Sequence, residues 1–199
     1  MRLLRLSICA LPVVAVLTAA PAHTAENPDW KRCADVNNKD VVGESLAACD
    51  RLYKDPAEAK NQAMILRNKC GIRYTNGDFD LALSDCNRAA KMDPKSSILY
   101  NRRGLIWYRK GDMDRAMSDY NRAIELNPRY PIALNNRALV FSKNKEYDRA
   151  LRDFDLAVEY DPNYARAIFN RGLTRKAKGD TAGAEADFAK ARQLDPNVD

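Results

Sequence analysis

The chain has 199 residues and a formal net charge of +6, and its 46% hydrophobic and 30% charged residues exclude a disordered or collagen-like protein. It contains a single histidine, His23, and 8 glycines, which leaves little from which to build a metal site, a nucleophile–base pair or a glycine-rich phosphate loop. The composition therefore favours a binding module over an enzyme, with no cofactor and no metal expected.

Residues 1–22 have the features of a secretory signal peptide. Arg2 and Arg5 provide its positive start, an apolar run follows over residues 6–20, and the small residues at its end form a cleavage site. We therefore expect an exported protein of bacterial type, located in the periplasm or secreted.

The alternative for this segment is a membrane anchor. Its apolar run is shorter than the roughly 20 residues of a membrane-spanning helix, and Pro12 interrupts it, so we expect no membrane span once the signal peptide is removed. Removal of Arg2 and Arg5 lowers the net charge to +4, and the remaining arginines alternate with aspartates. Because sequence-independent binding of nucleic acid needs a basic stripe, we expect no nucleic-acid partner.

A period of 34 residues organises the chain after residue 62. Four prolines keep this spacing, each directly after Asp or Asn: Pro94, Pro128, Pro162 and Pro196. Two sets of alanines keep it as well: Ala82, Ala116, Ala150 and Ala184, then Ala89, Ala123, Ala157 and Ala191. Residues 63–196 therefore form four repeats, followed by a short tail at 197–199; the repeats are 63–96, 97–130, 131–164 and 165–196.

Each repeat is predicted to contain two helices joined by a tight turn. Apolar residues recur at helical spacing before and after the turn, which is Gly-Asp in three repeats and Lys145-Glu146 in the third. A proline then ends the second helix, because it lacks the backbone N–H and clashes with the preceding turn.

This pattern resembles the tetratricopeptide repeat, which has small residues at positions 8, 20 and 27, an aromatic residue at 24 and proline at 32. In the second repeat these positions hold Gly104, Ala116, Ala123, Tyr120 and Pro128. The resemblance covers about two-thirds of the chain. It implies an all-α, right-handed α-solenoid of helix-turn-helix repeats, in which the first helices line a concave groove that binds proteins or peptides.

Four cysteines outside the signal peptide form two pairs with the same spacing. Cys33 and Cys49, and likewise Cys70 and Cys86, are 16 residues apart, the interval between positions 8 and 24 of the later repeats. Because an antiparallel hairpin brings these positions level, we expect the disulfides Cys33–Cys49 and Cys70–Cys86, as suits an exported protein. The alternative is a redox pair or a thiolate metal site, but no Cys-x-x-Cys motif occurs.

The first cysteine pair also marks a degenerate repeat within residues 23–62. Cys49-Asp50-Arg51 matches Cys86-Asn87-Arg88 of the first full repeat, although the turn of the leading hairpin is irregular. A poor hairpin at the end of an array would fray, which gives a structural reason for a disulfide there. The last repeat ends the array differently, with the polar Glu185 and Arg192 where earlier repeats have apolar residues.

Charged residues recur inside the repeats. Position 7 holds a cation in every repeat, and position 23 an aspartate: Lys69, Arg103, Arg137 and Arg171, with Asp85, Asp119, Asp153 and Asp187. One interpretation is a ladder of ion pairs between first and second helices, since a partly buried cation needs a partner. The other is that both sets face water, with surface pairs such as Arg115–Asp119.

The resemblance also implies which residues face the groove, namely positions 2, 5, 6, 9, 12 and 13 of each first helix. The candidate peptide-binding residues are Arg67, Asn68, Asn101, Arg102, Asn135, Asn136, Arg166 and Asn170. An asparagine amide carries both donors and an acceptor, so a row of them can hold an extended peptide backbone. Some relatives clamp a C-terminal carboxylate with Lys at position 5 and Asn at position 9, but position 9 here is Gly71 or Leu, so that clamp is not matched.

These features predict a non-catalytic adaptor that binds a protein or peptide in its concave groove. The interspersed arginines and lysines favour an acidic or extended segment as the partner. The alternative is a structural or envelope-assembly component that self-associates through its convex face or the ends of the array.

Overall fold

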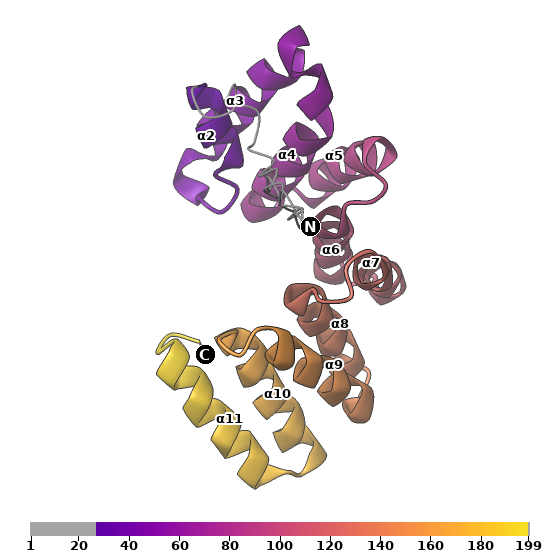
Figure 1. Cartoon of the computed structure of the whole chain (residues 1–199), viewed down its shortest axis with the longest axis vertical. Helices are drawn as coiled ribbons and strands as arrows, with labels where there is room; N and C mark the ends of the chain where they lie inside the picture. The colour runs from indigo at the N-terminus through magenta and orange to yellow at the C-terminus, as the bar shows by residue number, and fades with distance from the viewer. Residues whose placement is uncertain (1–26, 199) are drawn as a thin grey trace, which may run out of the picture.

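The computed structural model describes residues 27–198, so the signal peptide expected at 1–22 lies outside the described residues. Within 27–198 the structure has ten α-helices, two short 3-10 helices and no strand. The helices form antiparallel hairpins stacked along an arc (Figure 1). The all-α solenoid expected from the sequence is confirmed.

The helices follow the repeats. Their bounds are α2 Pro28–Ala34, α3 Val42–Lys54, α4 Gln62–Asn76, α5 Phe79–Met92, α6 Ser97–Arg109, α7 Met113–Leu126, α8 Pro131–Lys143, α9 Tyr147–Tyr160, α10 Ala165–Lys178 and α11 Thr181–Leu194, with the 3-10 helices η1 Lys39–Val41 and η2 Pro56–Asn61. In the described part of the chain the first helices α4, α6, α8 and α10 contact one another, whereas the second helices α5, α7, α9 and α11 do not. The first helices therefore lie on the inner, concave side of the arc.

The turn inside each full repeat needs a left-handed residue after the first helix. Gly77, Gly111 and Gly179 take φ values of 90°, 83° and 97° there, which glycine adopts without steric cost. In the second repeat the N–H of Asp112 donates to the carbonyl of Trp107 at 3.0 Å, which closes the helix end. The third repeat has Lys145 with φ 63° instead, the single non-glycine residue with positive φ among those described.

Close packing between the two helices of a hairpin depends on a small residue opposite a ring. A Cβ added at Gly104 would lie 2.8 Å from the Tyr120 ring, and one at Gly172 would lie 2.7 Å from the Phe188 ring. In the third repeat Ala138 and Phe154 form this pair, both fully buried. Burial raises the pKa of Tyr120, whose ring fills the space that the missing side chain leaves.

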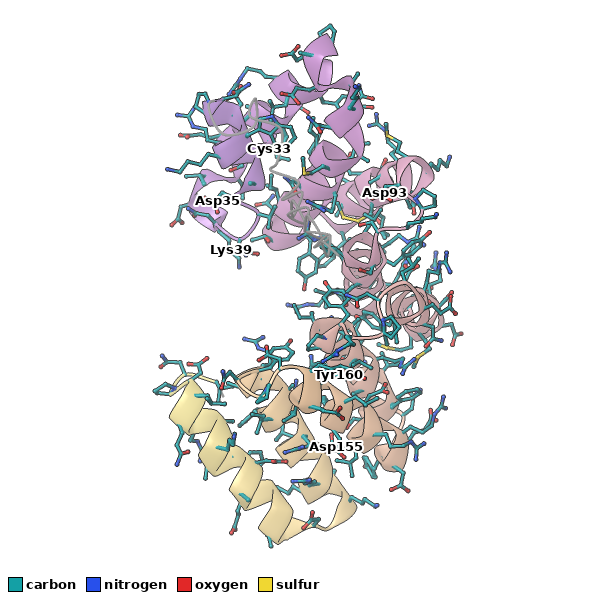
Figure 2. All side chains as sticks on the ribbon, viewed as in Figure 1. Cys33, Asp35, Lys39, Asp93, Asp155 and Tyr160 are labelled. Carbon is teal, nitrogen blue, oxygen red and sulfur yellow. A yellow bond between two sulfur atoms is a disulfide. The ribbon has the colours of Figure 1, made fainter. Side chains whose placement is uncertain are left out.

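In the two hairpins at the N-terminal end, a disulfide replaces the small residue and the ring at these positions. The structure joins Cys33 to Cys49 and Cys70 to Cys86, with sulfurs 2.13 Å and 2.01 Å apart, which are the two pairs that the spacing predicts. Cys33 lies on the short helix α2, in the leading hairpin (Figure 2). The buried Trp30 on the same helix donates from its indole nitrogen to the Glu58 carboxylate at 3.0 Å.

The segment after the last helix packs back onto the last repeat. Val198 is buried against Ala165, Ile168 and Ala191. Glu185 and Arg192 are exposed, as their polar character at the end of the array leads one to expect.

The turn geometry yields the first testable prediction. Gly111→Ala should lower the free energy of unfolding by about 1 kcal/mol, because a side chain is disfavoured at positive φ while nothing lies within 4 Å of the added methyl group. Lys145→Ala is the control, because the native residue already carries a Cβ, and it should change stability by less than about 0.5 kcal/mol. Urea unfolding of both variants measures the difference, and equal effects would contradict the prediction.

The second prediction concerns the leading hairpin. The double variant Cys33→Ser/Cys49→Ser should lose about 3 kcal/mol of stability, because the bond closes a loop of 16 residues. Digestion without reductant should recover the pairs Cys33–Cys49 and Cys70–Cys86, and titration of the native protein should find none of these four thiols free. A peptide linking Cys49 to Cys70 would contradict the pairing.

Candidate functional site

The arginines at position 7 of the last three repeats form bidentate ion pairs with the aspartate at position 23 of the same repeat. Arg103 donates to both carboxylate oxygens of Asp119, from Nε at 2.8 Å and from Nη2 at 2.6 Å. Arg137 holds Asp153 in the same way at 2.7 and 2.8 Å. The ion-pair interpretation is therefore confirmed for these repeats, and the surface alternative is wrong there.

Each of these arginines also reaches the preceding repeat. The third nitrogen of Arg103 donates to Asn87 at 3.0 Å, and that of Arg137 donates to Asn121 at 2.9 Å. One planar guanidinium thus joins three chain segments, which is a geometry that lysine cannot reproduce. We call these contacts the guanidinium rungs.

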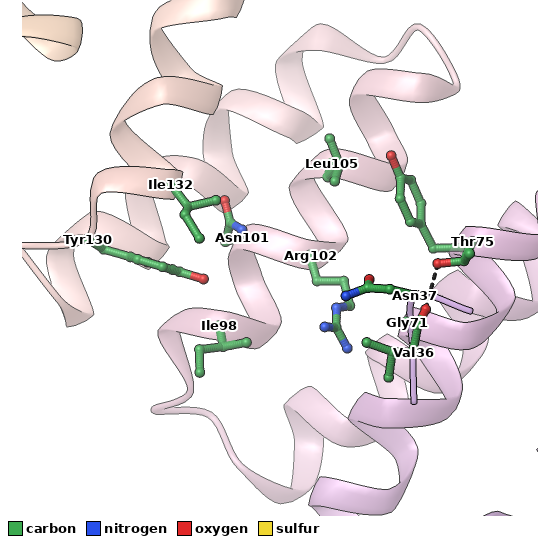
Figure 3. Close-up of a pocket in the computed structure, with 11 residues that line it drawn as sticks. Val36, Asn37, Gly71, Thr75, Ile98, Asn101, Arg102, Leu105, Tyr130 and Ile132 are labelled. Carbon is green, nitrogen blue, oxygen red and sulfur yellow. Dashed lines mark hydrogen bonds between the residues drawn. The ribbon is translucent and has the colours of Figure 1, made fainter. Parts of the chain in front are cut away.

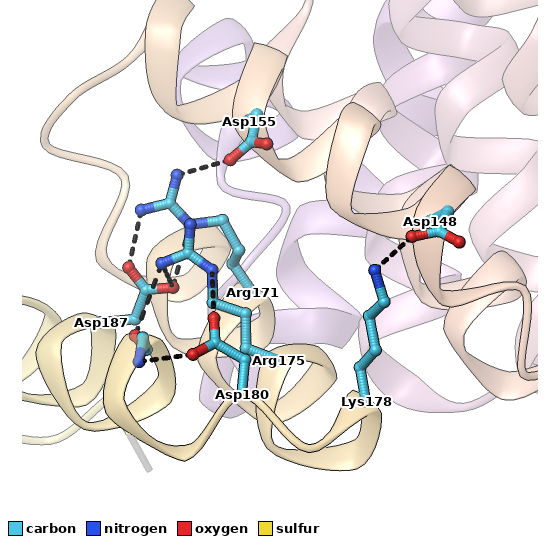
Figure 4. A network of polar contacts seen from close by, with 8 residues as sticks. Asp148, Asp155, Arg171, Arg175, Lys178, Asp180 and Asp187 are labelled. Atoms are coloured by element: carbon cyan, nitrogen blue, oxygen red, sulfur yellow. Dashed lines mark hydrogen bonds and ion pairs between the residues drawn. The ribbon is translucent and has the colours of Figure 1, made fainter.

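The last repeat has the most extensive rung (Figure 4). Arg171 donates to Asp187 at 3.0 and 2.6 Å and to Asp155 of the preceding repeat at 2.8 Å. Arg175 adds a further bond to Asp187 at 2.9 Å. The first full repeat differs, because Lys69 extends to Asp50 of the leading hairpin at 2.5 Å and leaves Asp85 to Arg73 at 2.6 Å.

The asparagines on the concave side bond to one another from repeat to repeat. Asn136 donates to Asn101 at 3.0 Å, Asn170 donates to Asn135 at 2.9 Å, and Asn135 donates to Asn136 at 3.2 Å. We call this series the amide chain. Asn101, Asn135 and Asn136 are buried, so their first role is to hold the first helices together.

These amide–amide bonds were not expected from the sequence, although the recurrence of asparagine at positions 5 and 6 was the signal for them. Of the other candidate groove residues, Asn68 is buried, Arg67 is partly buried and Arg166 is exposed on α10. The structure therefore brings four of the eight candidates into one bonded series, and the three arginines and Asn68 stand outside it.

A pocket of about 220 Å³ opens on the concave side near the N-terminal end (Figure 3). Its floor and walls come from α4, α6, the start of α8 and the turn after α2. The residues that line it include Val36, Asn37, Gly71, Ile98, Arg102 and Ile132. The sequence did not indicate the contribution of the turn, which the Thr75 hydroxyl fixes by donating to the Val36 carbonyl at 2.7 Å. We call this the Arg102 pocket.

Arg102 occupies the pocket because position 71 has no side chain. A Cβ added at Gly71 would collide with the end of the Arg102 guanidinium. Arg102 donates from Nη1 to the backbone carbonyl of Arg67 at 2.8 Å. Burial, and then repulsion from Arg67, lower the pKa of Arg102 from its ordinary value.

Neither a metal site nor a membrane-spanning segment is found in the described residues. Between residues 27 and 198 no group of three or more His, Cys, Asp or Glu side chains is placed to hold a metal ion. Over the same range no helix has both the length and the apolar character needed to cross a bilayer.

Family models place the repeats in a known class. Models described as tetratricopeptide repeat match residues 72–131, 131–164 and 165–198. Together these ranges cover well over half of the chain. A comparison with curated protein sequences finds no match.

Solved structures agree with the family models. A crystal structure of MamA is 21% identical, with a TM-score of 0.68 over 85% of this chain and 95% of that one. YrrB, titled a TPR protein with an unusual peptide-binding site, is 21% identical, with a TM-score of 0.60 over 90% and 95%. The first TPR of Spaghetti (RPAP3), bound to the HSP90 peptide SRMEEVD, is 24% identical, with a TM-score of 0.57 over 60% and 94%.

The third prediction concerns the guanidinium rungs. Arg137→Ala should lower the free energy of unfolding by about 3 kcal/mol, because it leaves the buried Asp153 without its cation. The matched control is Arg122→Ala, which breaks an exposed pair with Glu125 and should cost less than about 1 kcal/mol. Urea unfolding measures both, and similar losses would show that the rung contributes no more than a surface pair.

Proposed function

The chain belongs to the tetratricopeptide repeat family, and from this premise we propose that it is a non-catalytic adaptor that binds a protein or peptide along its concave face. The observation that carries the proposal is a set of apolar side chains exposed on the first helices. Ile98 and Ile132 are each 44% exposed and Leu173 is 47% exposed. Exposed aliphatic side chains beside polar ones are what a binding groove offers to a partner.

The helices that carry these side chains are held in place by side-chain hydrogen bonds between repeats. The guanidinium rungs and the amide chain join successive repeats, so the concave surface is formed before a partner arrives. A preformed surface loses less conformational entropy on binding, which leaves more of the contact energy for affinity.

The charges on this face favour an acidic or extended partner. Of the candidate groove residues, Arg67, Arg102 and Arg166 form no ion pair with a carboxylate in residues 27–198. Asn68 lies outside the amide chain, and its amide donor and acceptor can bond a peptide backbone in the groove. Two structurally similar proteins are titled for peptide binding, which supports the proposal.

We place the protein outside the cytoplasm, in the periplasm or secreted. The two cysteine pairs at disulfide distance support an oxidising compartment. The signal peptide at residues 1–22 belongs to the same proposal, as does the division into a stapled leading repeat at 23–62 and four repeats at 63–196.

The second candidate function is assembly of copies of this chain through the convex face or the ends of the array. It is favoured by Leu81, which is 54% exposed on the second helix α5, and by Leu156 on the second helix α9. Light scattering over a range of concentrations separates the two functions, because only assembly requires the mass to rise with concentration.

The fourth prediction tests the groove. Peptides selected from a random display library against the native protein should bind the Ile132→Ser/Leu173→Ser variant about tenfold more weakly or worse, because two aliphatic contacts are lost. These positions are better test sites than Asn136 or Asn170, whose replacement would also break the amide chain.

The matched control is Leu81→Ser, which replaces a leucine that is 54% exposed on the second helix α5 and should leave peptide affinity unchanged. Thermal unfolding should show all variants folded. If Leu81→Ser weakens binding and the double variant does not, the binding surface lies on the convex face and the groove proposal is overturned.

A further inference from the structure

We propose that the two N-terminal hairpins form a thiol-controlled unit, which stays folded against the later repeats only while its disulfides are intact. The unit consists of the leading hairpin, α2 and α3, and the first full repeat, α4 and α5, over residues 28–92. Repeats two to four, over residues 97–194, form a scaffold whose folding does not depend on the redox state. Assembly of this unit is independent of whether the concave face binds a peptide.

Disulfides and guanidinium rungs hold different parts of the array. Arg103, Arg137 and Arg171 hold repeats two to four, each by two bonds to an aspartate and one to the repeat before. Both cysteine pairs lie in the two hairpins before the first rung. The first full repeat has Lys69 at this position, and its partner Asp50 has a side chain that is 51% exposed. Because so exposed a pair contributes little to stability, the N-terminal hairpins depend on their sulfurs.

Each disulfide lies at the centre of the core of its hairpin. All four cysteines are fully buried, and Cys33 and Cys49 pack among Trp30, Leu52 and Ile65. In the later repeats a small residue and an aromatic ring fill the same place. Two separate thiols provide neither a bond nor a ring, so reduction leaves the hairpin without the packing that holds its two helices together.

The leading hairpin is the part that opens first. Helix α2 has 7 residues, whereas an isolated helix is marginal even at about 12–15, so its tertiary contacts keep it folded. Besides the disulfide these are the bond from Trp30 to Glu58 and the ion pair of Asp29 with Arg51, whose side chain is 55% exposed. The hairpin ends the described array, so a repeat packs against it on one side only.

This position sets the order in which the two disulfides are reduced. Local opening of α2 exposes Cys33–Cys49, whereas Cys70–Cys86 belongs to a repeat that packs against α3 on one side and α6 on the other. Because all four sulfurs are buried in the closed array, a reductant reaches the second pair only after the leading hairpin has opened.

The chemical step is thiol–disulfide exchange with a dithiol, and it transfers two electrons. A thiolate of the dithiol attacks one sulfur of Cys33–Cys49, and the other cysteine leaves as a thiolate and takes up a proton. The second thiol of the dithiol then attacks the mixed disulfide, so that the dithiol leaves as a disulfide and the protein carries two thiols. The reverse exchange, with a disulfide-bearing oxidoreductase as electron acceptor, closes the hairpin in an oxidising compartment.

Opening of the leading hairpin changes the concave side of the array. The turn after α2 lines the Arg102 pocket with Val36 and Asn37, and the bond from Thr75 to the Val36 carbonyl fixes this turn on α4 (Figure 3). Release of α2 removes this wall. The redox state thus decides whether the N-terminal end of the concave surface is complete.

The fifth prediction compares hydrogen exchange of the native protein with and without dithiothreitol. Amides of residues 28–54 should exchange about a hundredfold faster after reduction, because the cross-link that closes the leading hairpin is lost. Amides of residues 97–194 should exchange at unchanged rates. Pulsed alkylation with peptide mapping should label Cys33 and Cys49 before Cys70 and Cys86.

A matched pair of variants tests whether sulfur stands in for a ring. Cys70→Ala/Cys86→Phe supplies the small residue and ring that Ala138 and Phe154 supply in the third repeat, so residues 62–92 should stay protected in dithiothreitol. Cys70→Ala/Cys86→Ser supplies neither bond nor ring, and the same residues should lose protection even without reductant. The exchange and alkylation of the native protein test the proposal without either variant.

Four results would each overturn the proposal. The first is full protection of residues 28–54 in protein whose mapped cysteines are all reduced. The second is loss of protection that extends equally over residues 97–194, as when reduction occurs only on global unfolding. The third is alkylation of Cys70 and Cys86 before or together with Cys33 and Cys49, and the fourth is equal protection of residues 62–92 in the two variants. The adaptor function is tested separately, by the library-selected peptides with the oxidised protein.

Discussion

Every full repeat after the first is joined to the preceding repeat by one arginine, whose planar guanidinium bonds to side chains of both repeats. Arg103, Arg137 and Arg171 each bind a buried aspartate of their own hairpin and a side chain of the repeat before. A hydrophobic contact between two hairpins would tolerate sliding, whereas a bidentate pair with a third bond sets both distance and rotation. The relative placement of successive hairpins, and with it the concave surface, depends on this contact.

The concave side uses a second polar series for the same purpose. The amide chain runs between α6, α8 and α10, so the repeats are tied on the inner side of the arc by neutral groups and between their helices by charged ones. These amides bond to one another, while the aliphatic Ile98, Ile132 and Leu173 remain exposed on the first helices.

The leading hairpin departs from the family pattern and contributes to the groove through that departure. Its helix α2 is only 7 residues long and is held by the Cys33–Cys49 bond and by Trp30, rather than by a small residue packed against a ring. The turn that follows carries Val36 and Asn37 to the edge of the Arg102 pocket. The leading hairpin therefore forms one wall of the Arg102 pocket.

The sequence by itself determined the architecture, because a period of 34 residues with proline, alanine and Gly-Asp at fixed positions specifies a helical hairpin locally. It also indicated the cysteine pairs, since positions 16 apart are level in such a hairpin. Only the tertiary structure decided which polar groups meet between repeats: that Lys69 reaches Asp50, that Asn135 bonds to Asn170, and that Arg102 lies over Gly71. These contacts join residues of adjacent hairpins, and their partners depend on how one hairpin is rotated against the next, which periodicity within a hairpin does not specify.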